Sequence, residues 1–481
     1  MNQPLLGALA ASLVVVTACG GGGASSTSAA PAATAVVSHG TITGFGSVII
    51  DGLRYETSRA QFSVDGTSGR SQDDLSVGQR VTVRGTINDD GSRSAGEVAY
   101  EAELHGIVAS VDLAAGSFVA LGQTIVVDAS TIFSGVADLS GLAADNYIEV
   151  SGSRTADGSI LASYVEKESA RSELEVKGVV LELDATLKQL TIGSQLVDYS
   201  TATVPTGLTL ANGSFVEVKG TLVGSVLMAT RIAQEDDFRS GDRGTLAEVE
   251  GLVGALAEDR GSFRIGPTLV TVSGSTVYEG GSAATLVEGV KLEAKGTVQA
   301  DGSLAATRIE FKLSSHGGGD DNGGTFGAEA KIQATITALD ASARNFSVLG
   351  VTVKVADTTV YRDSRDEVRS FGYSGLAVGD YVELGLVEIA GELTASKVER
   401  DDNDSRQLVQ AAVDSIDAVG EVLAIAGIAV DASTASYKFN DATVSAEQFY
   451  ATVAVGSKLK AKGSYNGTML VATEVELDVE D

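Results

Sequence analysis

Six segments of the chain share one short pattern, in which apolar and polar residues alternate and a glycine closes the segment. They lie at 80–85, 147–152, 215–220, 291–296, 381–385 and 458–463, and their glycines follow one another at intervals of 67, 68, 76, 89 and 78 residues. A period of two is typical of a strand with one buried face. Each repeat is therefore expected to contribute one small β-unit to an array, which constrains the fold more than any other feature of the chain.

Turn signals surround every copy of this pattern. A short connection with leucine and glycine precedes it, as in DLSVGQ, GLAADN, TLVEGV and GLAVGD. An Asp-Gly or Asn-Gly pair often follows it, as at Asp157-Gly158, Asp301-Gly302 and Asn466-Gly467, and such pairs between alternating runs indicate hairpins. A long opening strand and a further hairpin lie upstream, for example in GIVASVD and SFVALGQTIVVD. Each repeat thus contains five expected strands.

Five short strands in about 65 to 75 residues are too few for a wide sandwich, and a closed barrel hides its edges best. The strand order resembles an OB-type barrel, although a compact up-and-down barrel would share the pattern. We therefore predict an all-β chain, a tandem array of about six small five-stranded OB-like β-barrels after a signal peptide and a flexible tether. The expected boundaries are 39–104, 105–170, 171–240, 245–315, 327–403 and 404–481 for the repeats, with a Gly/Asp linker at 316–326.

The N-terminus carries an apolar stretch, LLGALAASLVVV, which matches the core of a signal peptide and is too short for a stable membrane span. The run Val16-Thr17-Ala18-Cys19 resembles a bacterial lipobox, although the leader MNQP lacks the usual Lys or Arg. The resemblance implies cleavage after residue 18 and lipidation of Cys19, and Gly20 at the sorting position implies the outer membrane. Residues 19–38 read as a flexible tether. The alternative is a secreted protein with a chance cysteine.

The segment GTITGFGSVIIDGLRYET, together with DLSVGQRVTVRG and DGSLAATRIE, resembles the bacterial domain-of-unknown-function family numbered 5666. The resemblance covers nearly all of residues 39–480. It implies tandem copies behind a lipoprotein signal peptide, and it carries no assigned activity and no catalytic residues.

Net charge and cysteine content narrow the function further. The formal charge is −30, from 34 basic and 64 acidic residues, so binding to nucleic acid is disfavoured. Cys19 is the single cysteine, which leaves no partner for an intramolecular disulfide. The repeats must therefore be held by their own apolar cores.

The sequence contains no P-loop, nucleophile elbow or zincin motif. Two histidines, His39 and His105, occupy matching places at the heads of repeats 1 and 2, and a metal site there would need converging partners that the sequence does not identify. Two acidic clusters read as solvated connectors rather than calcium loops, namely His316 with Asp320 and Asp321, and Asp401-Asp402-Asn403-Asp404. We therefore predict no catalytic residue, no cofactor and no metal ligand, with Cys19 as the only modified residue.

The leading hypothesis is a non-catalytic cell-envelope lipoprotein, a β-barrel array that serves as spacer or interaction module in the bacterial outer membrane, facing the periplasm or the cell surface. Its expected partners are the membrane, through the lipid anchor, and a polysaccharide or an envelope protein. A carbohydrate-binding array is the alternative, with Phe45, Tyr55 and Tyr100 as contact residues unless they pack in the core. A carboxylate-dependent hydrolase is the third hypothesis.

Overall fold

The computed structural model describes residues 33–312, 329–389, 391–402, 406–439 and 442–477. Residues Ala33–Asp481 form one compact unit. The expected signal peptide, Cys19, most of the tether and the linker at 316–326 lie outside the described residues, as do His316, Asp320 and Asp321. The first strand begins at Thr34, so residues 34–38, which we assigned to the tether, belong to a strand instead.

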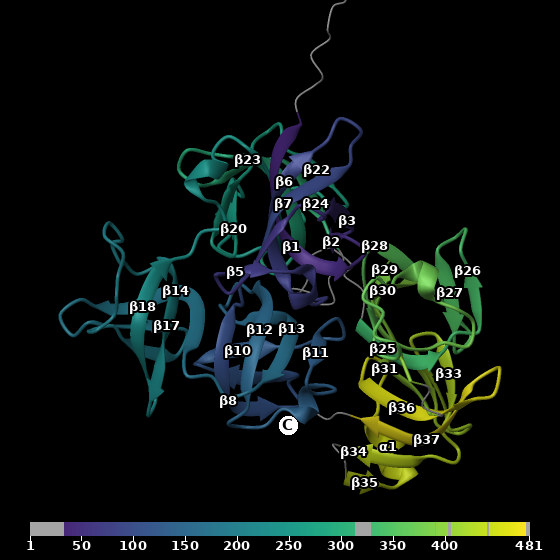
Figure 1. The fold of residues 1–481 in the computed structure, drawn as a ribbon. Coiled ribbons are helices and arrows are strands. Elements are labelled where there is room, and N and C mark those ends of the chain that lie inside the picture. The colour runs from purple at the N-terminus through teal and green to yellow at the C-terminus, as the bar shows by residue number, and fades with distance from the viewer. Residues whose placement is uncertain (1–32, 313–328, 390, 403–405, 440–441, 478–481) are drawn as a thin grey trace, which may run out of the picture. The chain divides into compact units, whose positions relative to one another are not determined.

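Strands make up nearly all of the regular secondary structure in the described residues (Figure 1). Repeat 1 consists of β1 (Thr34–Gly44), β2 (Val48–Ile50), β3 (Leu53–Glu56), β4 (Gln61–Val64), β5 (Thr67–Arg70), β6 (Arg80–Ile87) and β7 (Arg93–Tyr100). Repeat 2 consists of β8 (Leu104–Asp112), β9 (Ser117–Ala120), β10 (Gln123–Val126), β11 (Ile132–Ser134), β12 (Tyr147–Arg154) and β13 (Ile160–Glu168). Repeat 3 consists of β14 (Leu174–Asp184), β15 (Gln189–Ile192), β16 (Gln195–Asp198), β17 (Phe215–Val223) and β18 (Val226–Gln234).

The second half of the chain follows the same plan. Repeat 4 consists of β19 (Leu246–Leu252), β20 (Ser262–Ile265), β21 (Thr268–Thr271), β22 (Val277–Glu279), β23 (Lys291–Val298) and β24 (Leu304–Phe311). Repeat 5 consists of β25 (Glu329–Thr335), β26 (Ala338–Asp340), β27 (Asn345–Val348), β28 (Val351–Asp363), β29 (Tyr381–Ile389) and β30 (Glu392–Asp401). Repeat 6 consists of β31 (Gln407–Asp417), β32 (Val422–Ile425), β33 (Ile428–Asp431), β34 (Ser436–Phe439), β35 (Ala442–Val444), α1 (Ala446–Thr452), β36 (Lys458–Tyr465) and β37 (Leu470–Leu477).

The strands of each repeat close into a five-stranded barrel, as expected from the sequence. In repeat 2 the circuit runs β8–β9–β10–β13–β12 and returns to β8, and only the β10–β13 contact is parallel. This is the strand order of an OB-type barrel rather than an up-and-down barrel. Repeats 1, 3 and 6 close in the same way. Repeat 4 closes through the bridge Gly254↔Arg264. In repeat 5 the opening strand is divided into β25, which pairs with β29, and β26, which pairs with β27.

The glycine that ends each repeated motif has a structural cause. In every repeat the ladder between the last two barrel strands shifts register beside this glycine, which marks a β-bulge. A Cβ atom at Gly152, for example, would overlap the carbonyl oxygen of Leu161 on β13. Only glycine lets the two backbones approach this closely.

The connection that precedes each motif is more ordered than the sequence indicated. In repeats 1, 2, 4 and 6 it contains a short strand that runs parallel to the closing strand, as β11 does beside β13. Single-turn 3-10 helices lie in this connection at Gln72–Asp74, Leu139–Gly141 and Tyr373–Gly375, and a further one at Ser240–Asp242 lies between repeats 3 and 4. Repeat 6 has the helix α1 instead, which buries Phe449 and is capped by Ser445 and Gln448, a spacing that is visible in the sequence.

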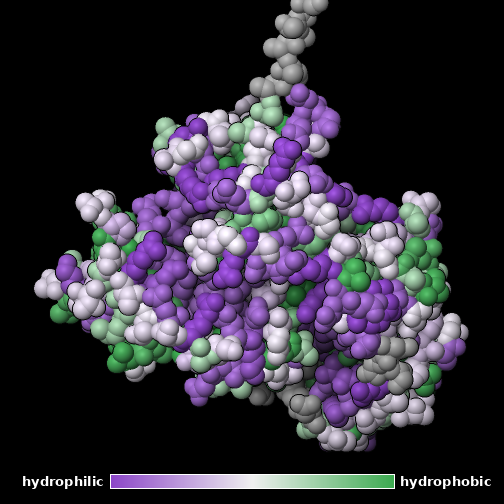
Figure 2. Space-filling view, in the orientation of Figure 1, coloured by the Kyte–Doolittle hydropathy of each residue, from purple (hydrophilic) through white to green (hydrophobic). Residues whose placement is uncertain are grey.

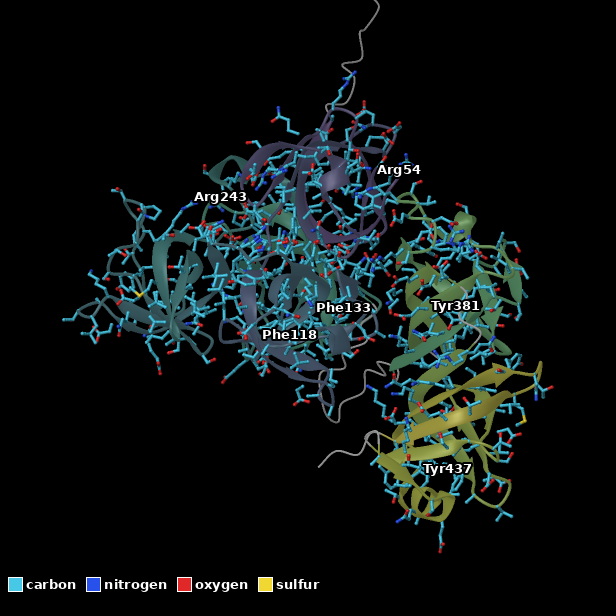
Figure 3. All side chains as sticks on the ribbon, turned by 60° about the horizontal axis from the view of Figure 1, so that its bottom comes forward. Arg54, Phe118, Phe133, Arg243, Tyr381 and Tyr437 are labelled. Carbon is cyan, nitrogen blue, oxygen red and sulfur yellow. The ribbon has the colours of Figure 1, made fainter. Side chains whose placement is uncertain are left out.

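The barrels join in pairs through their opening strands. β8 pairs with β14, β1 with β19, and β25 with β31, so that repeats 2 and 3, 1 and 4, and 5 and 6 each share one sheet. Repeats 2 and 3 also share a continuous apolar core, as do repeats 5 and 6. Phe118 and Tyr437, labelled in Figure 3, belong to these two cores.

The visible surface in Figure 2 is mostly hydrophilic, with scattered apolar patches. Exposed apolar side chains such as Leu181 and Val223 lie on repeat 3. Within the described ranges, no helix has the length and apolar character needed to cross a membrane.

Candidate functional site

Both histidines that the sequence singled out lie on opening strands, in equivalent register. His39 on β1 faces Thr82 on β6, and His105 on β8 faces Glu149 on β12. Lys177 on β14 faces Glu217 in the same register of repeat 3. This cross-strand position therefore carries a different polar side chain from one repeat to the next.

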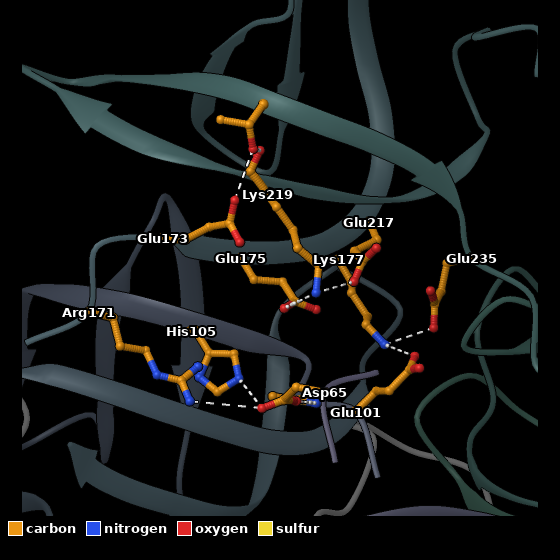
Figure 4. A network of polar contacts seen from close by, with 12 residues as sticks. Asp65, Glu101, His105, Arg171, Glu173, Glu175, Lys177, Glu217, Lys219 and Glu235 are labelled. Atoms are coloured by element: carbon orange, nitrogen blue, oxygen red, sulfur yellow. Dashed lines mark hydrogen bonds and ion pairs between the residues drawn. The ribbon is translucent and has the colours of Figure 1, made fainter. Parts of the chain in front are cut away.

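Around His105 the fold gathers carboxylates from two repeats. Figure 4 shows Asp65 with contacts to both His105 and Arg171. The imidazole is almost completely buried, with 2 % of its side chain exposed. Its Nε2 lies 3.1 Å from Asp65 Oδ2, and its Nδ1 lies 3.3 Å from Glu168 Oε2 and 4.0 Å from Glu149 Oε2. One ligand atom from each of Asp65, His105 and Glu149 lies within 4.8 Å of the others. Asp65, His105, Glu149 and Glu168 are called the His105 cluster below.

Glu149 is held from the side opposite His105. The Tyr100 hydroxyl donates a 2.5 Å hydrogen bond to Glu149 Oε1, and the side-chain amide of Gln79 donates to the same oxygen at 3.2 Å. Both donors belong to repeat 1, whereas Glu149 belongs to repeat 2. The second oxygen, Oε2, is thereby directed towards the His105 ring, beyond hydrogen-bond distance from it.

Asp65 reaches the cluster from a tight hairpin in repeat 1. Asp65 and Gly66 connect β4 to β5, with φ angles of 47° and 71°. Two successive positive φ values are typical of a type I′ turn, for which Asp-Gly is a preferred pair. The Asp65 backbone N–H donates to Tyr100 O at 2.9 Å, and its Oδ1 accepts from Ala102 N at 3.2 Å, so the carboxylate is fixed above β8.

Burial and charge displace the pKa values in this cluster. Burial by itself lowers the pKa of His105, but its hydrogen bonds to Asp65 and Glu168 prevail and raise it to about 9. Burial raises the pKa of Glu149 to about 7, against the opposing effects of Tyr100 and His105. At neutral pH and without a metal, His105 is therefore an imidazolium that donates from both ring nitrogens.

The polar row continues into repeat 3. Glu175 on β14 pairs with His105 across the shared sheet, and Lys219 on β17 pairs with Glu175. Lys219 Nζ lies 2.8 Å from Glu175 Oε2 and 2.9 Å from Glu217 Oε1. Burial and the neighbouring Glu217 raise the pKa of Glu175 to about 7. Here a lysine supplies the positive charge that the carboxylates need.

A second polar region surrounds a cavity of about 120 Å³ lined by residues of repeats 1 to 4. Lys177, with 4 % of its side chain exposed, lies 2.8 Å from Glu235 and 3.3 Å from Glu101. Arg84 makes charge-assisted hydrogen bonds to Asp242, the shortest at 3.0 Å. Cations and carboxylates are interleaved here, and the cavity is smaller than typical ligand pockets, so we assign it a structural role.

The other residues considered from the sequence have simpler environments. Phe45, Tyr55 and Tyr100 are buried, which confirms core packing for all three. His39 lies 3.0 Å from Thr82 Oγ1 and 3.8 Å from Asp237, and burial is the main reason that its pKa is lowered. Asp401 ends β30 with an exposed side chain. Asn403 and Asp404 lie outside the described residues.

The sequence indicated His105 but none of its partners. Glu149 was visible as the third residue of the repeated motif, in line with Glu217, Glu293 and Glu383. The Asp65-Gly66 pair was a hairpin signal that we did not use. These residues come together only because repeat 1 packs against repeat 2. Local sequence patterns do not predict how two repeats pack against each other.

Comparisons with known proteins bear on the family. One solved structure with a detected similarity, described as "drosophila Unr CSD456", is 14 % identical, with 49 % of this chain and 99 % of that chain covered and a TM-score of 0.12. None of the curated proteins compared with the chain matches it. The family model described as "Domain of unknown function (DUF5666)" matches residues 37–99, 105–166, 177–233, 250–310, 333–399 and 410–476. The chain therefore belongs to the DUF5666 family, of which it carries six tandem copies.

Proposed function

We propose that the chain is a non-catalytic cell-envelope lipoprotein, a lipid-anchored array of β-barrels that acts as a spacer or interaction module. The observation that carries the proposal is the pairing of barrels through their opening strands, as between β8 and β14. Barrels that share a sheet and a core resist bending at the junction, and a spacer needs this property. A string of barrels on flexible linkers would lack it.

Buried ion pairs between repeats add to the same argument. Arg93 of repeat 1 donates hydrogen bonds to both carboxylate oxygens of Glu248 in repeat 4, at 2.6 and 2.8 Å. Its Nη1 also donates to the Tyr55 hydroxyl at 2.7 Å. A bidentate arginine–carboxylate pair fixes orientation as well as distance. The β1–β19 junction is thus held by backbone and side chains together.

The surface favours an envelope protein over a polysaccharide as the partner. Every Phe and Tyr side chain in the described part of the chain is buried or half-buried, so none is presented as a flat exposed platform. Carbohydrate and base ligands that bind by stacking need such a platform. The charge of −30 further favours a neutral or basic partner surface.

Spin-label distances test the rigidity that the spacer role requires. In a Cys19→Ser background the chain has no other cysteine, so labels can be placed at Leu113→Cys in repeat 2 and Val223→Cys in repeat 3, both 62 % exposed. We expect one narrow distance distribution, as narrow as that of a control pair within repeat 3 at Val179→Cys and Leu187→Cys. A distribution much broader than the control would contradict a rigid spacer.

Capture from envelope extracts tests the interaction role. The fragment should begin at Ala33, where the compact unit begins, so that β1 is intact. We expect a saturable complex with an envelope protein. Binding to a glycan instead would favour the carbohydrate-binding alternative, and turnover of an envelope substrate by the purified fragment would overturn the non-catalytic proposal.

A further inference from the structure

The His105 cluster would carry an excess of negative charge if His105 lost a ring proton. Asp65, Glu149 and Glu168 supply three carboxylates, and Arg171 is a second cation beside them, 3.1 Å from Glu168 and 3.9 Å from Asp65. A metal ion that binds the imidazole displaces one ring proton. The three carboxylates then exceed the arginine by two charges, which is the charge of a divalent cation. Buried carboxylates are stable only when they are paired, protonated or bound to a metal.

Comparison between repeats shows which residue type differs at this position. Glu217 and Glu293 each have a lysine two residues later on the same strand, Lys219 at 2.9 Å and Lys295 at 3.3 Å. Glu383 is neutralised by Lys397 at 2.7 Å and Lys331 at 3.2 Å. Glu149 has Ser151 two residues later, and across the strand it faces His105, where Lys177 faces Glu217. Repeat 2 therefore carries a histidine, which can bind a metal, where repeat 3 carries a lysine.

The distances suit a small transition-metal ion. Two ligand atoms on a tetrahedral zinc, with bonds of about 2.0 to 2.1 Å, are about 3.4 Å apart. Asp65 Oδ2 lies 3.1 Å from His105 Nε2, and one ligand atom from each of Asp65, His105 and Glu149 lies within 4.8 Å of the others. The other ring nitrogen, Nδ1, lies 3.3 Å from Glu168 Oε2, and such a carboxylate partner orients metal-binding histidines in many proteins. Tyr100 and Gln79 orient Glu149 in the same way through its other oxygen.

We propose that Asp65 of repeat 1, together with His105 and Glu149 of repeat 2, binds a divalent transition-metal ion such as Zn²⁺, and that the ion fastens repeat 1 to repeat 2. Nitrogen and carboxylate ligands together suit zinc and its first-row neighbours better than calcium, which takes oxygen ligands. Because the ligands come from both repeats, bound metal stabilises the junction. The inference does not depend on the envelope role.

Zinc binding to the purified full chain, freed of metal by EDTA and titrated with ZnCl₂ in a calorimeter, is the primary test. We expect one tight site per chain. His105→Lys should lower the affinity by more than about 10-fold, because it removes the nitrogen ligand and keeps the positive charge that repeat 3 has at this position. Glu149→Gln should lower it by a similar factor. His39→Gln is the matched control, since it alters the equivalent position of repeat 1, and it should bind as the wild type does.

A spectroscopic readout keeps the test independent of variant stability. The chain has three histidines, so ring ¹⁵N resonances can be assigned with His39→Gln and His316→Gln. We expect zinc to shift the ring nitrogens of His105 and to leave those of His39 unchanged. Absence of a saturable site in the wild type, equal affinity in His105→Lys, or zinc shifts confined to His39 or His316 would overturn the proposal.

Discussion

His105 occupies, opposite Glu149, the register position that Lys177 occupies opposite Glu217. The two pairs lie on neighbouring strands of one sheet, since β8 and β14 are hydrogen-bonded. One repeat thus balances its buried glutamate with an ammonium group and the next with an imidazole. A lysine can only supply charge here, whereas a histidine can also bind a metal.

This relationship predicts the stability of two variants in metal-free buffer. His105→Lys should retain the stability of the wild type to within about 1 kcal/mol at pH 7, because it restores the pairing of repeat 3. His105→Gln should lose about 3 kcal/mol, because it leaves buried carboxylates without their main cation. Urea denaturation followed by circular dichroism measures both, and equal stability of the two variants would show that the charge of His105 is not needed.

Glycine at the bulge of each barrel should tolerate no side chain. In Gly85→Ala the new Cβ would overlap the carbonyl oxygen of Ser94, so the β6–β7 hairpin must open, at a cost of about 1 to 3 kcal/mol. Gly96→Ala in the same hairpin is the control, because its nearest contact is an ordinary 3.5 Å from Arg84 O. Hydrogen exchange of the β6 and β7 amides should increase in the first variant alone, and similar exchange in both would refute the explanation.

The ion pair between half-buried Glu383 and buried Lys397 should make repeat 5 sensitive to acid. Burial raises the pKa of Glu383, but Lys397 and Lys331 prevail and lower it from 4.5 to about 2. Its contribution to stability is therefore complete above pH 4.5 and is lost as the pH falls from about 4.5 to about 2. Glu383→Gln should cost about 3 kcal/mol at pH 7, and this difference from the wild type should shrink over the same range.

A surface pair of the same repeat provides the comparison for Glu383. Lys354 and Glu392 are 46 % and 56 % exposed, so Glu392→Gln should change stability by less than about 0.5 kcal/mol at any pH. Urea midpoints measured from pH 2 to pH 8 decide the matter. A Glu383→Gln cost that is independent of pH would mean that packing, and not ionisation, is responsible.

The proposed lipidation of Cys19 predicts where the chain is found in cells. Cys19→Ser should move the chain from the membrane fraction to the soluble fraction, because acyl chains provide the membrane affinity. Incorporation of labelled fatty acid into the wild type, and not into the variant, checks the chemistry. Unlabelled wild type would mean that the resemblance to a lipobox is accidental.

The fold was largely predictable because it depends on local signals that recur. Alternation predicted the barrel strands, Asp-Gly and Asn-Gly pairs predicted hairpins, and the repeat predicted their number. The helix α1 was also within reach, since Ser445 and Gln448 have capping-box spacing. We placed the start of β1 too late in the sequence. Thr34 to Ser38 follow a run of small residues, and that composition indicated that the tether continued to residue 38.

The candidate site was beyond sequence reasoning for a physical reason. Local patterns determine which residues form a strand and which face of the strand they occupy. These patterns placed His105 and Glu149 on strands, but they did not indicate that the two residues lie opposite each other. Register brings those two together, and the docking of repeat 1 adds Asp65 and Tyr100. Contacts between repeats depend on the shapes of two finished barrels. The sequence by itself thus determined six β-barrels, and only the tertiary structure decided which polar residues they bury against one another.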